Sequence, residues 1–201
     1  MRASLVFARI ALVYSISTVA LGNATQETQE PVPVVFQRLQ SQSPAEKGEA
    51  AAQLLKRGRS DPEVKEYLAV HLPPLIDKGP ARTDYPGDWI TLVRLARELR
   101  IAEAAHALTK WLTIDNIGEI TTAGFINLEN NPAGKALAEI GDPAIPPLTK
   151  VFDHGTLRER RYPVYVLRLI NSPSAKSMLR EQMNREPDEG LRDFIQKTLA
   201  S

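Results

Sequence analysis

The sequence predicts an all-α protein, an α-α superhelix in which about four helical hairpins stack side by side and a last helix caps the C-terminal end. Three observations support this prediction. Capping residues stand directly before proline at five places, apolar residues recur at helical spacing, and short segments recur at offsets of 31 to 40 residues. No comparable stretch alternates between apolar and polar residues, so we expect no β-sheet.

Each of five predicted helix starts joins a side-chain cap to a proline. A side-chain oxygen at the cap accepts a hydrogen bond from an otherwise unpaired amide, and proline in the first turn removes an amide that has no helical partner. Ser43 and Glu46 also have the spacing of a capping box. The five pairs are Ser43-Pro44, Asp61-Pro62, Asn131-Pro132, Asp142-Pro143 and Ser172-Pro173.

These starts and the spacing of the apolar residues place the helices in order. The expected hairpins are 44–57 with 62–78, 88–99 with 102–113, 131–140 with 143–153, and 157–170 with 173–184, followed by a cap at 188–200. Pro146, Pro147 and Pro163 fall inside predicted helices, so we expect those helices to kink or to begin late. Segment 113–130 breaks the period and is predicted to be an irregular insertion, either functional or merely tolerated.

Internal similarity is clearest between the second helices of two hairpins. Ala107-Leu-Thr-Lys110 recurs as Pro147-Leu-Thr-Lys150, 40 positions later. Over 136–148 a helix ending in Ile-Gly meets an Asp-Pro cap and a second helix beginning Ala-Ile-Pro-Pro-Leu, and this order resembles the HEAT-repeat superfamily. The resemblance extends from 131 to 199 and is weaker over 89–112 and 44–79. It implies a HEAT-like solenoid but no particular activity, because this repeat serves many functions.

The first 22 residues are typical of a secretory signal peptide. Arg2 and Arg9 precede the 12-residue apolar stretch 10–21, which small residues follow. An uncleaved membrane anchor is the alternative. We therefore expect a secreted or periplasmic protein, with a flexible polar linker at 23–43, containing one short turn near 34–39, before a helical domain at 44–201. Cleavage would remove two arginines and no acids, changing 25 basic and 24 acidic residues to 23 and 24, or +1 to −1.

Composition excludes several kinds of chemistry. The absence of Cys excludes disulfides, thiolate zinc sites and a cysteine nucleophile, and a net charge near zero provides no field for nucleic acid. His71, His106 and His154 have no second His or carboxylate at i+3 or i+4, and none forms the His-Glu dipeptide of helical-repeat hydroxylases. Neither Gly-x-Ser-x-Gly nor a phosphate-binding loop occurs. We therefore expect no catalytic residue, no cofactor and no metal site.

One surface pattern repeats on the second helices. Thr109, Thr149 and Arg180 align in one row, and Lys110 and Lys150 align with Glu181 in the next row. The HEAT resemblance implies that second helices line a concave face. We therefore predict a shallow cationic strip for an acidic or extended protein partner, formed by Lys110, Lys150, Arg180, Thr109 and Thr149.

Other charged and aromatic residues have structural interpretations. The densest basic run is Arg158-Glu-Arg-Arg161 together with Arg168, and it could bind a phosphate or an acidic partner. The HEAT resemblance instead implies an arginine–aspartate pair here, with Asp153 as the acid. The carboxylates within 181–189 are predicted to be solvated. Aromatic residues that could stack on a sugar ring are Tyr85, Trp89 and Trp111.

Three functions remain after these exclusions. We favour an exported, non-catalytic HEAT-like scaffold that binds another protein through its concave face, with no nucleic acid and no stable membrane insertion. The first alternative is a binder of cell-wall or extracellular polymer. The second is a cofactor-attaching enzyme similar to the phycobilin lyases, against which the export signal and the missing reactive groups weigh.

Overall fold

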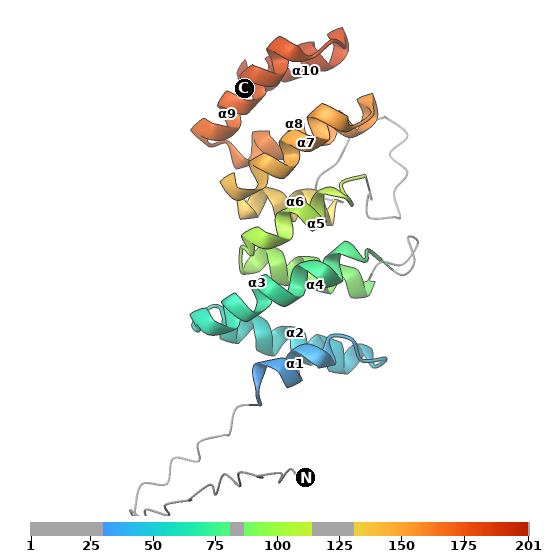
Figure 1. Ribbon diagram of the computed structural model, residues 1–201, viewed down its shortest axis with the longest axis vertical. Helices are drawn as coiled ribbons and strands as arrows, with labels where there is room; N and C mark the ends of the chain where they lie inside the picture. Colours follow the sequence, from blue (N-terminus) through green and yellow to red (C-terminus); the bar gives the residue numbers. More distant parts are fainter. Residues whose placement is uncertain (1–29, 81–86, 114–130, 201) are drawn as a thin grey trace, which may run out of the picture.

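The computed structural model describes residues 30–80, 87–113 and 131–200, and every regular element in these ranges is a helix (Figure 1). The prediction of an all-α fold is confirmed. The predicted signal peptide at 1–22, the beginning of the linker and nearly all of the 113–130 insertion lie outside the described residues.

The α-helices follow the predicted order, with one additional helix at the start. Short 3-10 segments, η1 at Ala102–Ala104 and η3 at Asp142–Ala144, lead into two of them. The bounds are α1 Val32–Arg38, α2 Pro44–Gly58, α3 Pro62–Asp77, α4 Gly87–Glu98, α5 Ala105–Thr109, α6 Pro132–Ile140, α7 Ile145–His154, α8 Leu157–Ile170, α9 Pro173–Arg185 and α10 Glu189–Ala200.

The helices form two layers. Helices α2, α4, α6, α8 and α10 contact one another in series and form the first-helix layer. Helices α3, α5, α7 and α9 form the second-helix layer, again by contacts between successive members. The elements are stacked along one long axis from α1 to α10 (Figure 1). This arrangement of hairpins is compatible with an α-solenoid.

Leucines from both layers fill the space between them. Because a helix places positions i, i+4 and i+7 on one face, the buried leucines of a helix project to the same side. Their complete burial along the stack shows that one continuous core joins the hairpins. Leucines with no exposed surface are Leu54, Leu68, Leu72, Leu108, Leu137 and Leu148.

Four of the five predicted caps are confirmed. Ser43, Asp61, Asn131 and Ser172 each accept a hydrogen bond from a backbone amide in the first turn of the following helix. Asp142 is different, because it begins the 3-10 segment η3. Its carboxylate instead accepts a hydrogen bond from the Ser172 hydroxyl, which joins two neighbouring interhelical turns.

The prolines and the capping boxes are only partly as predicted. Helix α7 begins late, at Ile145, so that Pro146 and Pro147 fall in its first turn, whereas α8 is continuous through Pro163. Glu46 does not complete the predicted capping box, because its carboxylate accepts a hydrogen bond from the Ser41 hydroxyl. A complete capping box instead begins α8, where Thr156 and Glu159 bond reciprocally.

The packed part of the chain begins before the predicted domain boundary at residue 44. Helix α1 lies within the segment predicted to be a linker, buries Val35 and Phe36, and packs on α2. Arg57 from the last turn of α2 also donates a hydrogen bond to the Glu30 carbonyl, with Nη1 and O 2.7 Å apart. The linker prediction is therefore corrected for 30–43, because a short apolar helix covers the exposed end of the stack.

Two predictions about charged residues were wrong. Asp153 pairs with Arg185, with 3.7 Å between Oδ1 and Nη1, rather than with an arginine of the 158–161 run. Glu186, which was expected to be solvated, is buried with no exposed side-chain surface. Its carboxylate contacts Arg160 at 3.1 Å and accepts a hydrogen bond from Gln182 at 3.0 Å. The ion pair therefore joins α8 to the end of α9.

Candidate functional site

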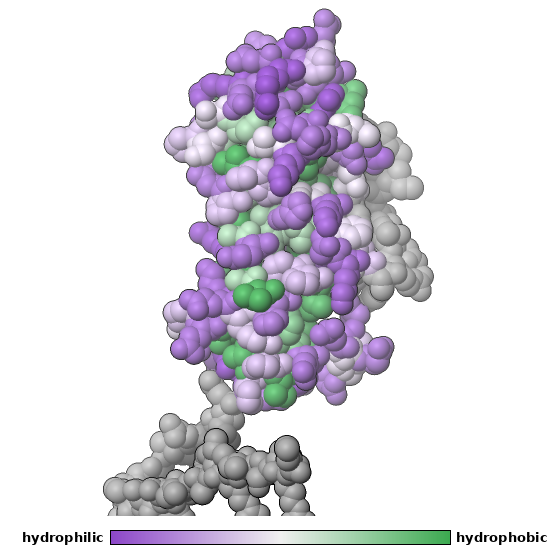
Figure 2. Space-filling model, viewed as in Figure 1, coloured by the Kyte–Doolittle hydropathy of each residue, from purple (hydrophilic) through white to green (hydrophobic). Residues whose placement is uncertain are grey.

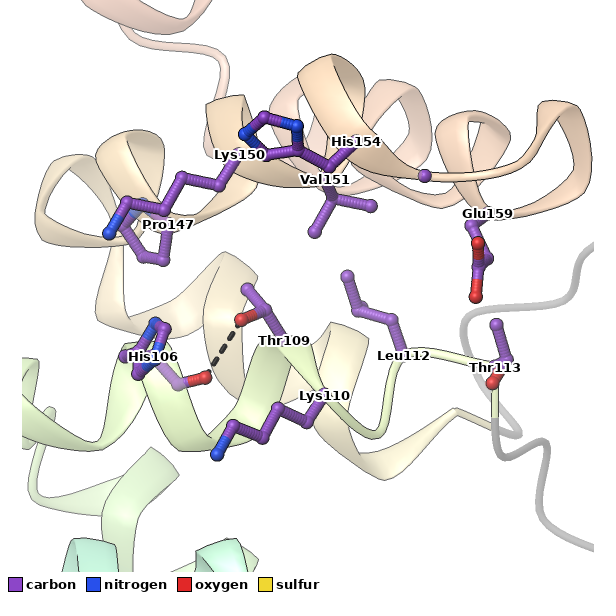
Figure 3. A pocket seen from close by; sticks show the side chains of 11 residues that line it. His106, Thr109, Lys110, Leu112, Thr113, Pro147, Lys150, Val151, His154 and Glu159 are labelled. Atoms are coloured by element: carbon purple, nitrogen blue, oxygen red, sulfur yellow. Dashed lines mark hydrogen bonds between the residues drawn. The ribbon is translucent and has the colours of Figure 1, made fainter.

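A groove lies between α5 and α7, two adjacent helices of the second-helix layer. We call it the α5–α7 groove, and its volume is about 350 Å³. Figure 3 shows the α5 side chains along one wall and the α7 side chains along the other. It is lined by His106, Thr109, Lys110, Leu112, Thr113, Pro147, Lys150, Val151, His154, Gly155 and Glu159.

The repeated Leu-Thr-Lys sequence explains how the two walls are positioned. Leu108 and Leu148 are both 0% exposed and anchor their helices in the core. Because the lysine two positions later is rotated away from the anchored face, Lys110 and Lys150 are exposed. The same helical geometry that fixes the hairpins therefore presents two cationic side chains on the surface.

One end of the groove is fixed by contacts outside the two helices. After Thr109 the chain continues in tighter i to i+3 turns, in which the Trp111 amide donates to the Leu108 carbonyl. The buried side chain of Asn131 donates to the Leu112 carbonyl, with Nδ2 and O 2.5 Å apart. This hydrogen bond ties the end of α5 to the start of α6.

The two lysines that line the groove differ in whether another group of the protein already neutralises their charge. Lys110 forms an ion pair with Asp77 of α3, with 2.5 Å between Nζ and Oδ1, and its side chain extends away from α7 (Figure 3). Lys150 forms no ion pair within the described ranges. Lys150 is therefore the lysine whose charge a ligand in the groove meets directly.

Glu159 is the one carboxylate among the described lining residues. The Thr156 backbone amide and hydroxyl donate hydrogen bonds to it at 2.7 and 2.8 Å. These donors stabilise the charged form and lower the pKa of Glu159 below its ordinary value. Glu159 therefore stays ionised at neutral and mildly acidic pH, engaged at the start of its own helix.

The middle of the groove is apolar. Leu112 and Val151 face one another across it, while Pro147 lies beside Lys150 at one end and Glu159 faces Thr113 at the other (Figure 3). The Thr109 hydroxyl is engaged, because it donates to the His106 carbonyl at 2.8 Å. An apolar centre with polar groups at its edges is the usual composition of a recognition site.

The structure brings three of the five predicted strip residues into this groove. Thr109, Lys110 and Lys150 line it, but Thr149 and Arg180 do not. The Thr149 hydroxyl donates to the Ile145 carbonyl at 3.0 Å and lies 3.2 Å from Met178 Sδ, so it faces α9. Arg180 is exposed farther along, on α9.

Two lining residues, His106 and His154, were treated in the sequence as isolated surface histidines. A usable signal was present, because each aligned lysine has a histidine one helical turn away. His106 precedes Lys110 by four residues, and His154 follows Lys150 by four. The signal was missed because one histidine comes before its lysine in the sequence and the other comes after it. The two histidines therefore do not align with each other in the repeat.

The two tryptophans that the structure describes do not form an exposed stacking surface. Trp89 is 2% exposed, and its indole N–H donates to the Ile76 carbonyl at 3.1 Å. Trp111 is partly buried against it, with the ring centroids 6.2 Å apart in an edge-on arrangement. Tyr85 lies outside the described residues.

Comparisons with known proteins add no relative. No protein-family model, no curated protein and no solved structure matches the chain. Within the described ranges, no group of three or more His, Asp or Glu side chains could hold a metal ion. None of the helices described there combines the length and the apolar character that crossing a bilayer requires.

Proposed function

We propose that this protein is an exported, non-catalytic scaffold of the HEAT-like type that binds another protein through its second-helix layer. The α5–α7 groove is the observation that carries the proposal, because it combines exposed cationic side chains with an apolar centre on the surface where the sequence pattern repeats. Export is supported by the basic and apolar pattern of residues 1–22, which lie outside the described structure.

The surrounding surface also supports binding of a partner rather than a small substrate. Figure 2 shows a face dominated by hydrophilic side chains, with apolar residues scattered between them. Solenoids present such extended surfaces to partner proteins. The polymer-binding alternative needs accessible rings, and the burial of Trp89 removes one of its three candidate residues.

Charge reversal tests the proposal. The full chain, expressed with its N-terminus intact and tagged at its C-terminus, is used to capture partners from the exported fraction of its own cells. We expect a specific protein to be recovered, and its yield to fall about tenfold in the Lys110→Glu, Lys150→Glu, Arg180→Glu variant, because the charge of the second-helix layer is reversed, including that of Lys150 in the groove.

The matched control reverses three exposed basic residues of the first-helix layer. Lys56→Glu, Arg161→Glu and Arg192→Glu change the net charge by the same amount on α2, α8 and α10. This variant should capture the partner as the unmodified chain does. Equal capture by the second-helix-layer variant would refute the proposed binding surface.

A further inference from the structure

We infer that the α5–α7 groove binds an acidic, extended segment of a partner protein, and binds it more tightly as the pH falls from 8 to 5.5, through His106 and His154 on its two walls. This inference rests on the proposed function and specifies its ligand. It places one histidine on each wall of the groove, His106 on α5 and His154 in the last turn of α7.

Both imidazoles are available to a ligand. His106 and His154 are exposed, and neither side chain forms a hydrogen bond or an ion pair in the part of the chain that the structure describes. Figure 3 shows His106 across the groove from Pro147 and Lys150, and His154 on the α7 wall beyond Lys150. A ligand in the groove therefore meets both imidazoles and the Lys150 ammonium group.

Several of the fixed charges near the histidines are already engaged by other groups of the protein. Lys110 is paired with Asp77, and the Glu159 carboxylate is held by two donors from Thr156. Asp153, the chain neighbour of His154, is engaged by Arg185. Lys110 and Lys150 are thus accompanied by the carboxylates of Asp77 and Glu159, and the exposed Glu103 lies three residues before His106, so the fixed charges alone do not make the groove strongly cationic.

Protonation changes this balance. Histidine side chains generally become cationic as the pH falls from 8 to 5, whereas glutamates of a flexible peptide, with an ordinary pKa of about 4.3, are still mostly ionised at pH 5.5. A groove with a histidine on each wall therefore becomes more positive over this range, while an acidic ligand keeps its negative charge. Attraction between them increases as the pH falls.

The shape and the apolar centre of the groove favour a polypeptide over a nucleic acid. Leu112 and Val151 offer a contact for one apolar side chain between the cationic positions. Nucleic acids bind through many phosphate contacts made by a strongly basic surface, whereas the net charge of this chain is +1. An extended segment in which acidic residues flank an apolar residue matches both the apolar centre of the groove and the cationic positions on either side of it.

Fluorescence anisotropy with a defined probe tests the inference on the full chain. The probe is a labelled, end-blocked peptide of about ten residues, in which glutamates flank a central leucine. We expect its dissociation constant to be about fivefold lower at pH 5.5 than at pH 8.0, because attraction between solvent-exposed charges is modest. The His106→Gln, His154→Gln variant should bind with one affinity at both pH values.

Controls separate this result from a general effect of pH. His71→Gln changes an exposed histidine that stacks on Tyr67, with ring centroids 4.2 Å apart, outside the groove, and it should keep the full pH dependence. A peptide with glutamine in place of glutamate, and a single-stranded DNA of similar length, should bind more weakly than the acidic probe at pH 5.5.

Several results would overturn the inference. These are equal affinity at both pH values, pH dependence that survives in the double histidine variant, no binding of the acidic peptide, or tighter binding of the DNA. Capture of a protein partner that is lost on charge reversal, combined with any of these results, would leave the scaffold proposal in place while removing the acidic-ligand inference.

Discussion

Replacing Arg160 with methionine is expected to lower the free energy of unfolding by about 3 kcal/mol, because it leaves the buried Glu186 carboxylate without its cation. Arg160 Nη2 lies 3.1 Å from Glu186 Oε1, and the Glu186 side chain has no exposed surface. Methionine keeps much of the apolar length of the side chain, so the loss reports mainly on the charge. Urea denaturation followed by circular dichroism measures the change.

Two further variants isolate the ion pair. Arg158→Met changes an exposed arginine in the same helix and should alter stability by less than about 0.5 kcal/mol. Adding Glu186→Gln to Arg160→Met should restore part of the loss, because the remaining amide no longer carries a buried charge. If Arg160→Met unfolds at the same urea concentration as Arg158→Met, the buried pair does not stabilise the α8–α9 junction.

Replacing Gly79 with alanine is expected to lower the free energy of unfolding by about 3 kcal/mol, through steric overlap and backbone strain together. A Cβ atom at this position would lie 2.1 Å from Cζ2 of the Trp111 ring. The Gly79 φ angle is +72°, in the left-handed region that disfavours side chains. Thermal and urea unfolding measure the loss, and near-ultraviolet circular dichroism reports on the Trp111 environment.

Gly48→Ala is the matched control, because this glycine lies inside α2 and nothing lies within 4 Å of an added Cβ. Alanine there should raise the free energy of unfolding by about 0.5 to 1 kcal/mol through its higher helix propensity. A Gly79→Ala variant as stable as the unmodified chain would show that Trp111 does not pack on the turn after α3.

Local signals predicted most of the fold. The caps at Ser43, Asp61, Asn131 and Ser172 were readable because a capping residue followed by proline acts within one turn of the helix it begins. Helix α1 was not predicted as part of the packed domain, because seven residues give too little periodicity. Its burial depends on a surface of α2 that no local pattern reveals.

Long-range contacts explain why other predictions failed. Glu186 has the sequence context of a solvated turn residue, and only the packing of α8 against α9 brings Arg160 to it. Asp153 was expected to pair with an arginine just after it, but the two-layer stack brings Arg185 of α9 beside it instead. Neither pairing follows from spacing along the chain.

The sequence predicted only part of the candidate site, because the rest of it depends on contacts between helices that are distant in the chain. The repeated Leu-Thr-Lys placed Lys110 and Lys150 on adjacent helices, because an internal repeat with buried leucines fixes which side faces outward. The predicted row did not continue to Arg180, since α9 meets α7 through contacts such as that of Thr149 with Met178. The sequence did not indicate that His106 and His154 share a groove, because that depends on the packing of α5 against α7.

The central claim is that a protein partner binds between α5 and α7, and amide chemical-shift mapping tests it most directly. The ¹⁵N-labelled chain is titrated with the acidic peptide probe at pH 5.5. We expect the largest shifts to fall on 105–113 and 146–155. Shifts concentrated on the first-helix layer, or no saturable shifts at all, would contradict it.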